Sequence, residues 1–199
     1  MKLILASGSV YRRALLERFS QPLQLALECI SPDIDESPLP GESAATTALR
    51  LAAAKARAVA ASLPTPDAPC LLIGSDQVAE LGDLQLGKPG NAARACAQLR
   101  QMSGQTVTFH TALAVLEPVS GRLQQDNIQT TVRLRNLSDA EIERYVALEQ
   151  PFDCAGSAKV EGLGISLLDE LAGSDPTALI GLPLIALARM LRAEGIALP

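Results

Sequence analysis

Short apolar runs alternate with longer helical patterns along the chain, which predicts a mixed α/β protein. Residues 3–6 and 70–74 are continuous apolar runs, typical of short buried strands. Residues 106–116 and 123–134 are longer strand-like segments joined by a turn, so they should pair as antiparallel neighbours. The Ala-rich stretch 43–62 indicates a long helix with a small-residue face. Because hairpins and helix crossovers both occur, we expect a mixed sheet rather than a purely parallel one.

Caps, turns and shorter runs predict the remaining elements. A capping box at Ser138–Glu141 marks the start of one helix, and Asn91 caps another. The other expected elements are a helix opening at residue 11, a strand at 23–30, a loop at 64–69, a hairpin at 78–86 around Gly82, helices at 91–102 and 138–149, a strand at 163–168, helix starts at Pro176 and Pro183, and a last helix at 184–193.

The junction after the first strand suits an anion. Ser7 and Ser9 lie in a small polar loop, and Arg12 and Arg13 follow in the first helical turn. Loop amides and the first N–H groups of a helix point outward without partners, and hydroxyl and guanidinium groups suit phosphate oxygens. Neither GxxxxGK[ST] nor GxGxxG occurs, so phosphate would bind here by another pattern. The alternative is an ordinary turn with a solvated arginine pair.

Composition limits the partners. The 199 residues favour one domain over 1–199, which can form two lobes around a cleft, and 48% apolar residues are ample for a core. Lys and Arg number 17 against 22 Asp and Glu, so the net charge is −5. An acidic chain argues against binding a nucleic-acid polymer, which needs a basic face, but it permits a local basic pocket for one nucleotide.

The spacing of the cysteines and the single histidine limit the kinds of site that the chain can form. Cys29, Cys70, Cys96 and Cys154 are widely spaced without a CxxC motif, so we expect reduced, mostly buried thiols in a cytoplasmic protein. His110 is the only histidine, and its alternating surroundings predict packing within a sheet. The N-terminal apolar run is too short for a signal peptide, and no charge-free stretch reaches membrane-spanning length, so we expect no membrane association.

Asp76 is the most informative single residue. It directly follows a buried apolar run, so we expect it at the tip of a strand, where α/β proteins place their chemistry and where a carboxylate needs a partner. Polar residues of the small loops and strand ends complete the candidate set: Ser7, Ser9, Arg12, Arg13, Glu36, Gln77, Lys88, Ser157, Lys159 and Glu161, with Lys55 if its helix faces the cleft.

Such a set, which has no histidine base or cysteine nucleophile, fits metal-assisted attack of water on a phosphate chain. Cations would hold the phosphates, carboxylates would hold a divalent ion, and one carboxylate would accept the proton from water. The alternatives are ordinary ones. Lys55 can be a solvated charge on a helix, and the acidic segment 33–36 can be a solvated loop.

Several segments, in this order, resemble the Maf family of nucleoside triphosphate pyrophosphatases: LASGSVYRRALL, DIDE, the Ala-rich helix with Lys55, IGSDQV, GKP, SG before a β run, CAGSAKVEGLG and DPTALIGLPL. Together they extend over almost the whole chain. The resemblance implies a mixed, extended sheet flanked by helices, with two lobes around a central cleft. It also implies cleavage between the α- and β-phosphates and suggests a homodimer. Val10 departs from the family, which usually has Pro there, but no chemical group is lost.

By this resemblance, Asp76 is the proton acceptor, and Glu36 and Asp76 hold a divalent metal such as Mg²⁺, Mn²⁺ or Co²⁺. With the loop residues included, the candidate phosphate ligands are Ser7, Ser9, Arg12, Arg13, Lys55, Lys88, Ser157 and Lys159.

Within the family, Ser75-Asp76-Gln77 together with Tyr11 and Glu161 resembles the subgroup that acts on 7-methyl-GTP; the dTTP/UTP subgroup usually has Thr after the catalytic Asp. N7 methylation makes the base cationic, so Tyr11 can stack on it and Glu161 can accept hydrogen bonds from the guanine edge. Gln77 would read the remaining edge. In the alternative, Tyr11 packs on its helix, Glu161 is solvated and Gln77 only orients Asp76.

These residues predict hydrolysis of 7-methyl-GTP to 7-methyl-GMP and pyrophosphate. Two other functions stay open at this point. One is the same chemistry on dTTP, UTP or a modified purine nucleotide. The other is a nucleotide-binding inhibitor of septum formation, which would need the cations but not the water-activating Asp76.

Overall fold

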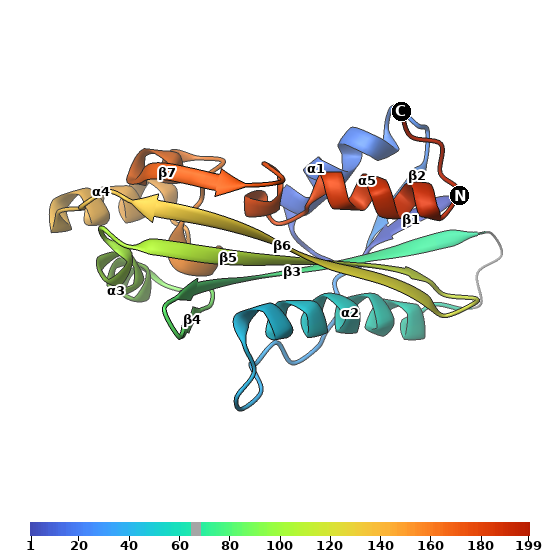
Figure 1. Cartoon of the computed structure of the whole chain (residues 1–199), viewed down its shortest axis with the longest axis horizontal. Coiled ribbons are helices and arrows are strands. Elements are labelled where there is room, and N and C mark those ends of the chain that lie inside the picture. Colours follow the sequence, from blue (N-terminus) through green and yellow to red (C-terminus); the bar gives the residue numbers. More distant parts are fainter. Residues whose placement is uncertain (65–68) are drawn as a thin grey trace. The chain divides into compact units, whose positions relative to one another are not determined.

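The computed structural model describes residues 1–64 and 69–199, so most of the loop expected at 64–69 lies outside the described residues. Within these ranges, seven strands form one sheet in the order β2-β1-β3-β5-β6-β7, with β4 paired to β3 (Figure 1). The strands are β1 (Lys2–Leu5), β2 (Ala26–Cys29), β3 (Cys70–Leu81), β4 (Leu84–Leu86), β5 (Thr106–Glu117), β6 (Arg122–Leu134) and β7 (Leu168–Gly173). The helices are α1 (Val10–Ser20), α2 (Ala44–Ser62), α3 (Ala92–Met102), α4 (Asp139–Glu149) and α5 (Leu184–Ala193).

The sheet is mixed, as the sequence predicts. β1 pairs in parallel with both β2 and β3, whereas β4 is antiparallel to β3 and β7 is antiparallel to β6. The predicted hairpin is confirmed, because Leu81 pairs with Leu84 across the two-residue turn at Gly82, whose φ is +59°. The mixed α/β fold class is therefore confirmed.

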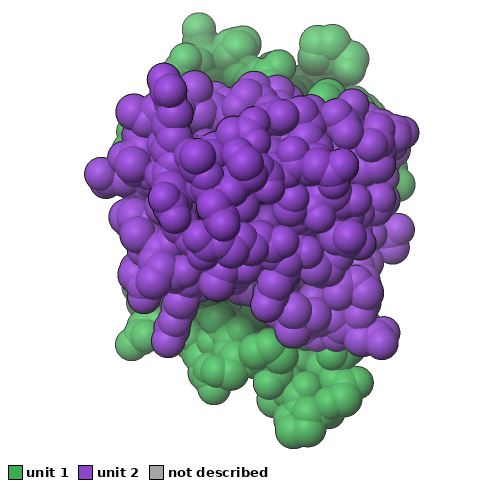
Figure 2. All heavy atoms as spheres, turned by 90° about the vertical axis from the view of Figure 1, so that its left-hand side faces the viewer, with its two compact units in different colours: residues 1–76, 111–128, 175–199 green, residues 77–110, 129–174 purple. Residues whose placement is uncertain are grey.

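The chain divides into two compact units, which Figure 2 shows in different colours. Unit 1 consists of Met1–Asp76, Thr111–Ile128 and Asp175–Pro199, and unit 2 consists of Gln77–His110 and Gln129–Ser174. The strands β3, β5 and β6 contribute residues to both units. The single domain and the central cleft stay predictions.

In unit 1 the strands carry apolar side chains on both faces. Leu3 and Leu5 belong to the cluster that packs with α1 and α5, whereas Ile4 and Ala6 belong to the cluster that packs with α2. Figure 1 shows α1 and α5 on one side of these strands and α2 on the other. Continuous apolar runs are the pattern of strands buried on both faces, which explains why the period-2 signal is missing from the sequence.

In unit 2, α3 and α4 pack against each other and against the loop segments that follow α4. The capping box at the start of α4 is confirmed: Ser138 accepts from the Glu141 N–H, and the Glu141 carboxylate accepts from the Ser138 N–H. The short 3₁₀ turn Ala155–Ser157 contains Gly156, whose φ is +65°. A Cβ there would also press on Ala79, Met102 and Phe109, so this turn needs glycine.

Some expected elements were wrong. The strand predicted at 163–168 is a 3₁₀ turn, Leu163–Leu167, and pairing with β6 starts only at Leu168. Pro176 precedes only the 3₁₀ turn Ala178–Ile180 rather than an α-helix, and β2 is shorter than the predicted strand. Short apolar runs do not distinguish strands from buried turns, because the partner that decides between them is distant in the sequence.

The cysteine prediction was partly wrong. All four cysteines are free, but only Cys70 is buried, and Cys29 is exposed. His110 is 5% exposed within β5, and its Nε2 lies 3.1 Å from Glu80 Oε2, so the expected sheet packing is confirmed. Across the described ranges, none of the helices combines the length and the apolarity that a membrane crossing requires.

Candidate active site

Asp76 lies in the middle of β3 rather than at its tip, so the expected strand end was wrong. β3 continues to Leu81 because its second half has a new partner: Ala79 pairs with Leu86 of β4. The neighbouring strand β1 does end here, since its last residue, Leu5, pairs with Ile73. Asp76 therefore lies just beyond the carboxyl end of β1, with its side chain 9% exposed.

Lys55 connects two carboxylates. Its Nζ lies 2.6 Å from Asp76 Oδ1 and 2.7 Å from Glu36 Oε1, and its side chain is only 6% exposed. The interpretation of Lys55 as a solvated helix charge was therefore wrong. Because both carboxylates contact the same ammonium group, their oxygens lie close together. Glu36 is the more exposed partner, with a side chain that is 44% accessible.

A close approach of α2 to β3 places Lys55 beside Asp76. A Cβ built on Gly74 would lie 2.1 Å from the carbonyl oxygen of Ala52, so no other residue fits without a backbone shift. Lys55 follows Ala52 by almost one helical turn, and Asp76 follows Gly74 by two residues, which brings both side chains to the same face of β3.

Arg12 lies beside this group. Its Nε donates to the Gly181 carbonyl at 2.9 Å, and one terminal nitrogen donates to the Ser75 carbonyl at 2.7 Å. Burial lowers the pKa of Arg12, and the negative charges of Asp76 and Glu36 oppose this shift. A guanidinium remains protonated in proteins, so Arg12 is a half-buried positive charge near the two carboxylates.

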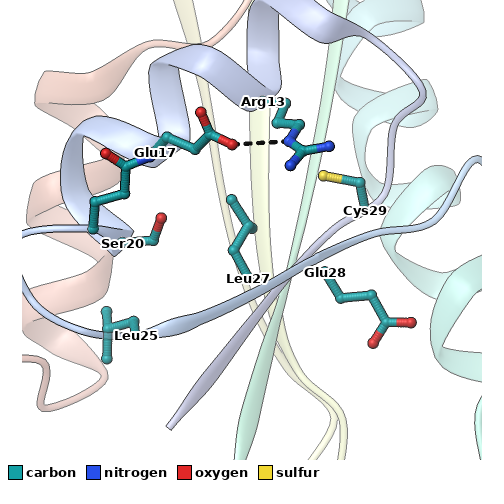
Figure 3. Close-up of a pocket in the computed structure, with 8 residues that line it drawn as sticks. Arg13, Glu17, Ser20, Leu25, Leu27, Glu28 and Cys29 are labelled. Atoms are coloured by element: carbon teal, nitrogen blue, oxygen red, sulfur yellow. Dashed lines mark hydrogen bonds and ion pairs between the residues drawn. The ribbon is translucent and has the colours of Figure 1, made fainter.

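The two loop serines shape the start of α1. The Ser9 hydroxyl caps the helix by accepting from the Arg12 N–H at 3.4 Å, and the Ser7 hydroxyl accepts from the Ser9 N–H at 3.1 Å. Arg13 points elsewhere: it pairs with Glu17 at 2.8 Å in a surface pocket of about 470 Å³ that also contains Cys29 (Figure 3). Adjacent residues of a helix point about 100° apart, so Arg12 and Arg13 contact different parts of the protein.

The cations predicted in unit 2 lie on loops. Lys159 pairs with Glu149 of α4 at 2.7 Å, and this contact lowers the pKa of Glu149. The Tyr145 hydroxyl accepts from the Lys159 N–H at 3.0 Å and donates to the Ser157 carbonyl at 3.1 Å. Burial of Tyr145 raises its pKa, so it stays a protonated donor. Lys88 is exposed in the segment that follows β4.

The predicted base-reading residues lie in both units. Tyr11 is half-buried on α1 of unit 1, whereas Gln77 and Glu161 belong to unit 2. Desolvation raises the pKa of Glu161, and the nearby positive charge of Lys159 opposes the shift. Their roles toward a base stay predictions.

The model of the family described as "Maf-like protein" matches residues 2–194. The chain belongs to the Maf family. Proteins called 7-methyl-GTP pyrophosphatase are among the relatives of this Maf chain. One from Aromatoleum aromaticum is 60% identical over 198 residues, which is 100% of this chain and 98% of that protein. Others from Burkholderia lata and Cupriavidus metallidurans are each 58% identical, covering 96% and 97% of this chain and 89% and 93% of theirs.

A solved structure was also found. It is described as a nucleoside-triphosphatase / dITP/XTP pyrophosphatase from Mycobacterium abscessus, is 18% identical and has a TM-score of 0.42, with 98% of each chain covered.

The carboxylates of this Maf chain fit a divalent cation. Glu36 and Asp76 present oxygens close enough to contact one ammonium group. Mg²⁺ is commonly held by one or two carboxylates, with substrate phosphates and waters as its other ligands. Residues 1–64 and 69–199 contain no cluster of three or more His, Cys, Asp or Glu side chains arranged for a metal.

Several residues that lie next to the predicted site residues were not predicted from the sequence. Gly74 and Gly181 act through their backbones, and Gln98, Tyr145 and Glu149 contact the loops of unit 2. Gly74 lies in the segment IGSDQV and Gly181 in DPTALIGLPL, so the resemblance of these segments to the family could have indicated both glycines. The three helix residues look like ordinary helix-surface positions and have no comparable signal.

Proposed function

We propose that this member of the Maf family hydrolyses 7-methyl-GTP to 7-methyl-GMP and pyrophosphate. The observation that carries the proposal is the group in which the buried Lys55 contacts both the buried Asp76 and the more exposed Glu36, near Arg12. It occurs in a chain that is 60% identical, over its full length, to a protein called 7-methyl-GTP pyrophosphatase. Buried cations suit a polyphosphate, and a held carboxylate suits the removal of a proton from water.

Asp76 is the proton acceptor in this proposal. The carboxylate takes one proton from a water molecule, whose oxygen bonds to a phosphorus of the α–β anhydride. The bond from that phosphorus to the bridging oxygen breaks, and its electron pair leaves with the bridging oxygen. Lys55 holds the carboxylate in place through the 2.6 Å contact, and Arg12 supplies positive charge that is partly desolvated before substrate binds.

Glu36 and Asp76 would hold a divalent metal. A bound divalent ion neutralises negative charge on the phosphates. Lys55 lies between the two carboxylates, so its ammonium group either shares them with the cation or turns toward a phosphate oxygen. In both arrangements Lys55 and Arg12 would provide positive charge for the phosphates of the proposed substrate.

The methylated base supplies the specificity. A delocalised positive charge on 7-methylguanine favours an aromatic ring and a carboxylate over a neutral pocket. We assign these roles to Tyr11 and Glu161, with Gln77 on the remaining edge. Because the pKa of Glu161 is raised, this carboxylate should lose its charge at a higher pH than an ordinary glutamate. The preference for the methylated base should therefore weaken as the pH falls through that pKa.

A substrate comparison tests this function. kcat/KM is measured for 7-methyl-GTP, GTP, dTTP and UTP with Mg²⁺, and the products are separated by chromatography. The intact protein should prefer 7-methyl-GTP and release pyrophosphate. Glu161→Gln should reduce that preference more than it slows the other substrates. Glu143→Gln, at an exposed glutamate of the same unit, is the matched control and should change neither.

Three results would contradict parts of the proposal. Orthophosphate and a diphosphate as the first products would exclude a pyrophosphatase. A preference for dTTP or UTP would exclude 7-methyl-GTP as the substrate and leave the chemistry standing. Tight nucleotide binding without turnover would favour a binding regulator.

A further inference from the structure

One side chain of α3 bonds to both loops of unit 2 that carry predicted phosphate ligands. Gln98 Nε2 donates to the Gly87 carbonyl at 3.0 Å, immediately before Lys88. Gln98 Oε1 accepts from the Ser157 hydroxyl at 2.6 Å, two residues before Lys159. Both ends of the amide are therefore used, each by a different loop.

The chemistry of the partners fixes the orientation of the amide. A backbone carbonyl can only accept, so the NH₂ end of Gln98 must face Gly87, and the oxygen is then left to accept from Ser157. Ser157 is completely buried and has a φ of +58°, an uncommon conformation for a residue with a side chain. Such a conformation persists only where neighbouring contacts hold it.

The helix behind Gln98 is firmly anchored. Asn91 caps α3 by accepting from the Arg94 N–H, and Ala95, Leu99 and Met102 are all buried. Two backbone hydrogen bonds also join the same segments: Gly90 N–H donates to the Phe152 carbonyl at 3.0 Å, and Gly156 N–H donates to the Gly87 carbonyl at 3.4 Å. Gln98 is the side chain that connects this anchored helix to both loops.

We propose that Gln98 is a positioning residue of the phosphate site. It holds the Lys88 loop and the Ser157–Lys159 loop at a fixed spacing, so that their cations meet a triphosphate without first being ordered. The inference rests on the proposed function, because only within it do Lys88 and Lys159 bind phosphate. Preordering of this kind lowers the entropic cost of binding, so its loss should appear mainly in KM.

The test compares Gln98→Met with the intact protein. Methionine has a similar length but can neither donate to Gly87 nor accept from Ser157 in the same way. Losing two hydrogen bonds, each of ordinary net strength, should raise KM for 7-methyl-GTP about five- to thirtyfold, with kcat changed less than about threefold. Gln101→Met is the matched control on an exposed position of the same helix and should leave KM unchanged.

A double-mutant cycle separates positioning from a general structural role. In the Lys88→Ala background, Gln98→Met should raise KM by less than about threefold, because one of the two loops has already lost its function. An equal loss in both backgrounds would show that Gln98 acts through stability alone and would overturn the proposal.

A second measurement needs no substrate and so separates failure of this inference from failure of the proposed function. Hydrogen exchange of the backbone amides should become faster in Gln98→Met at both 86–90 and 154–159, and unchanged in Gln101→Met. Faster exchange in only one loop, or in neither, would overturn the proposal. Faster exchange in both with no turnover of 7-methyl-GTP by the intact protein would retain the positioning role and reject the substrate.

Discussion

Lys55 and Asp76 in unit 1 are held differently from Lys88 and Lys159, the lysines predicted for the site in unit 2. In unit 1, Lys55 and Asp76 lie on α2 and β3, with side chains that are 6% and 9% exposed, and they contact each other directly. In unit 2, Lys88 and Lys159 lie on loops, and Lys159 is 21% exposed. There, helix side chains such as Glu149 and Gln98 hold the loops in place.

The difference follows from the work that each region is proposed to do. A group that moves a proton must be placed to within a fraction of an ångström, which regular elements provide better than loops. Groups that only bind phosphate can be placed less exactly, so they can lie on loops. A mobile loop must be ordered when the ligand binds, and this costs conformational entropy. In unit 1, changes that move the backbone should therefore lower stability and activity most. In unit 2, the sensitive positions should be the side chains that contact its loops.

Removal of divalent metal should have the largest effect on activity among the changes that leave Asp76 in place. If Glu36 and Asp76 hold a cation against the phosphates, exhaustive chelation should lower turnover about a hundredfold or more, because the charge stabilisation is worth several kcal/mol. Turnover of 7-methyl-GTP is measured before chelation, after it, and after Mg²⁺ is restored. Undiminished turnover in the chelated protein would mean that Lys55 and Arg12 alone neutralise the phosphates.

Gly74→Ala should be the next most severe change. The new methyl group would lie 2.1 Å from the Ala52 carbonyl oxygen, so α2 must move away from β3 and take Lys55 with it. Overpacking of this kind costs about 1–3 kcal/mol of unfolding free energy, measured by urea denaturation. Gly87→Ala is the control: its Cβ would meet no heavy atom within 4 Å, and its effect should be within about 0.5 kcal/mol. Equal losses of unfolding free energy in Gly74→Ala and Gly87→Ala would show that α2 can move away from β3 without cost.

Glu149→Gln should have the smallest effect. Glutamine can still accept from the Leu163 N–H but loses the charge that pairs with Lys159. A partly exposed ion pair of this kind contributes about 0.5–1 kcal/mol at neutral pH. The pKa of Glu149 is lowered by folding, so the contribution is present above the ordinary glutamate pKa and is lost as the pH falls through the lower folded value.

Urea unfolding over a pH series checks this prediction. The unfolding free energies of the intact protein and Glu149→Gln should differ at neutral pH and become equal in acid. The unfolding free energy of Glu143→Gln should equal that of the intact protein at every pH. A difference that persists unchanged in acid would assign the effect to packing rather than to charge.

Much of the fold follows from local sequence. Asn91 and Ser138 cap the helices that they were expected to begin, because capping depends on a few neighbouring residues. The strand predicted at 163–168 failed because strand pairing depends on a distant partner, and here β6 pairs only from Leu168 onward. The strand end expected at Asp76 failed for the same reason, since β4 extends the pairing of β3.

The candidate site was predictable where chemistry stands out in the sequence. Asp76, Glu36 and Lys55 were expected together, and the structure brings these three together. Arg12 and Arg13 could not be told apart, because only the tertiary contacts with Ser75 and Gly181 distinguish them. Gln98 could not be found, since a glutamine on a helix acquires its role only when two loops fold against it.

Asp76→Asn tests the central claim most directly. The substitution keeps the shape of the side chain and removes the proton acceptor, while Glu36 still pairs with Lys55. The dissociation constant for 7-methyl-GTP is measured by calorimetry and the cleavage rate by single-turnover experiments. We expect near-normal binding with a rate lowered about 10²–10⁴-fold. A near-normal cleavage rate would contradict the account and assign the proton to Glu36 or another carboxylate.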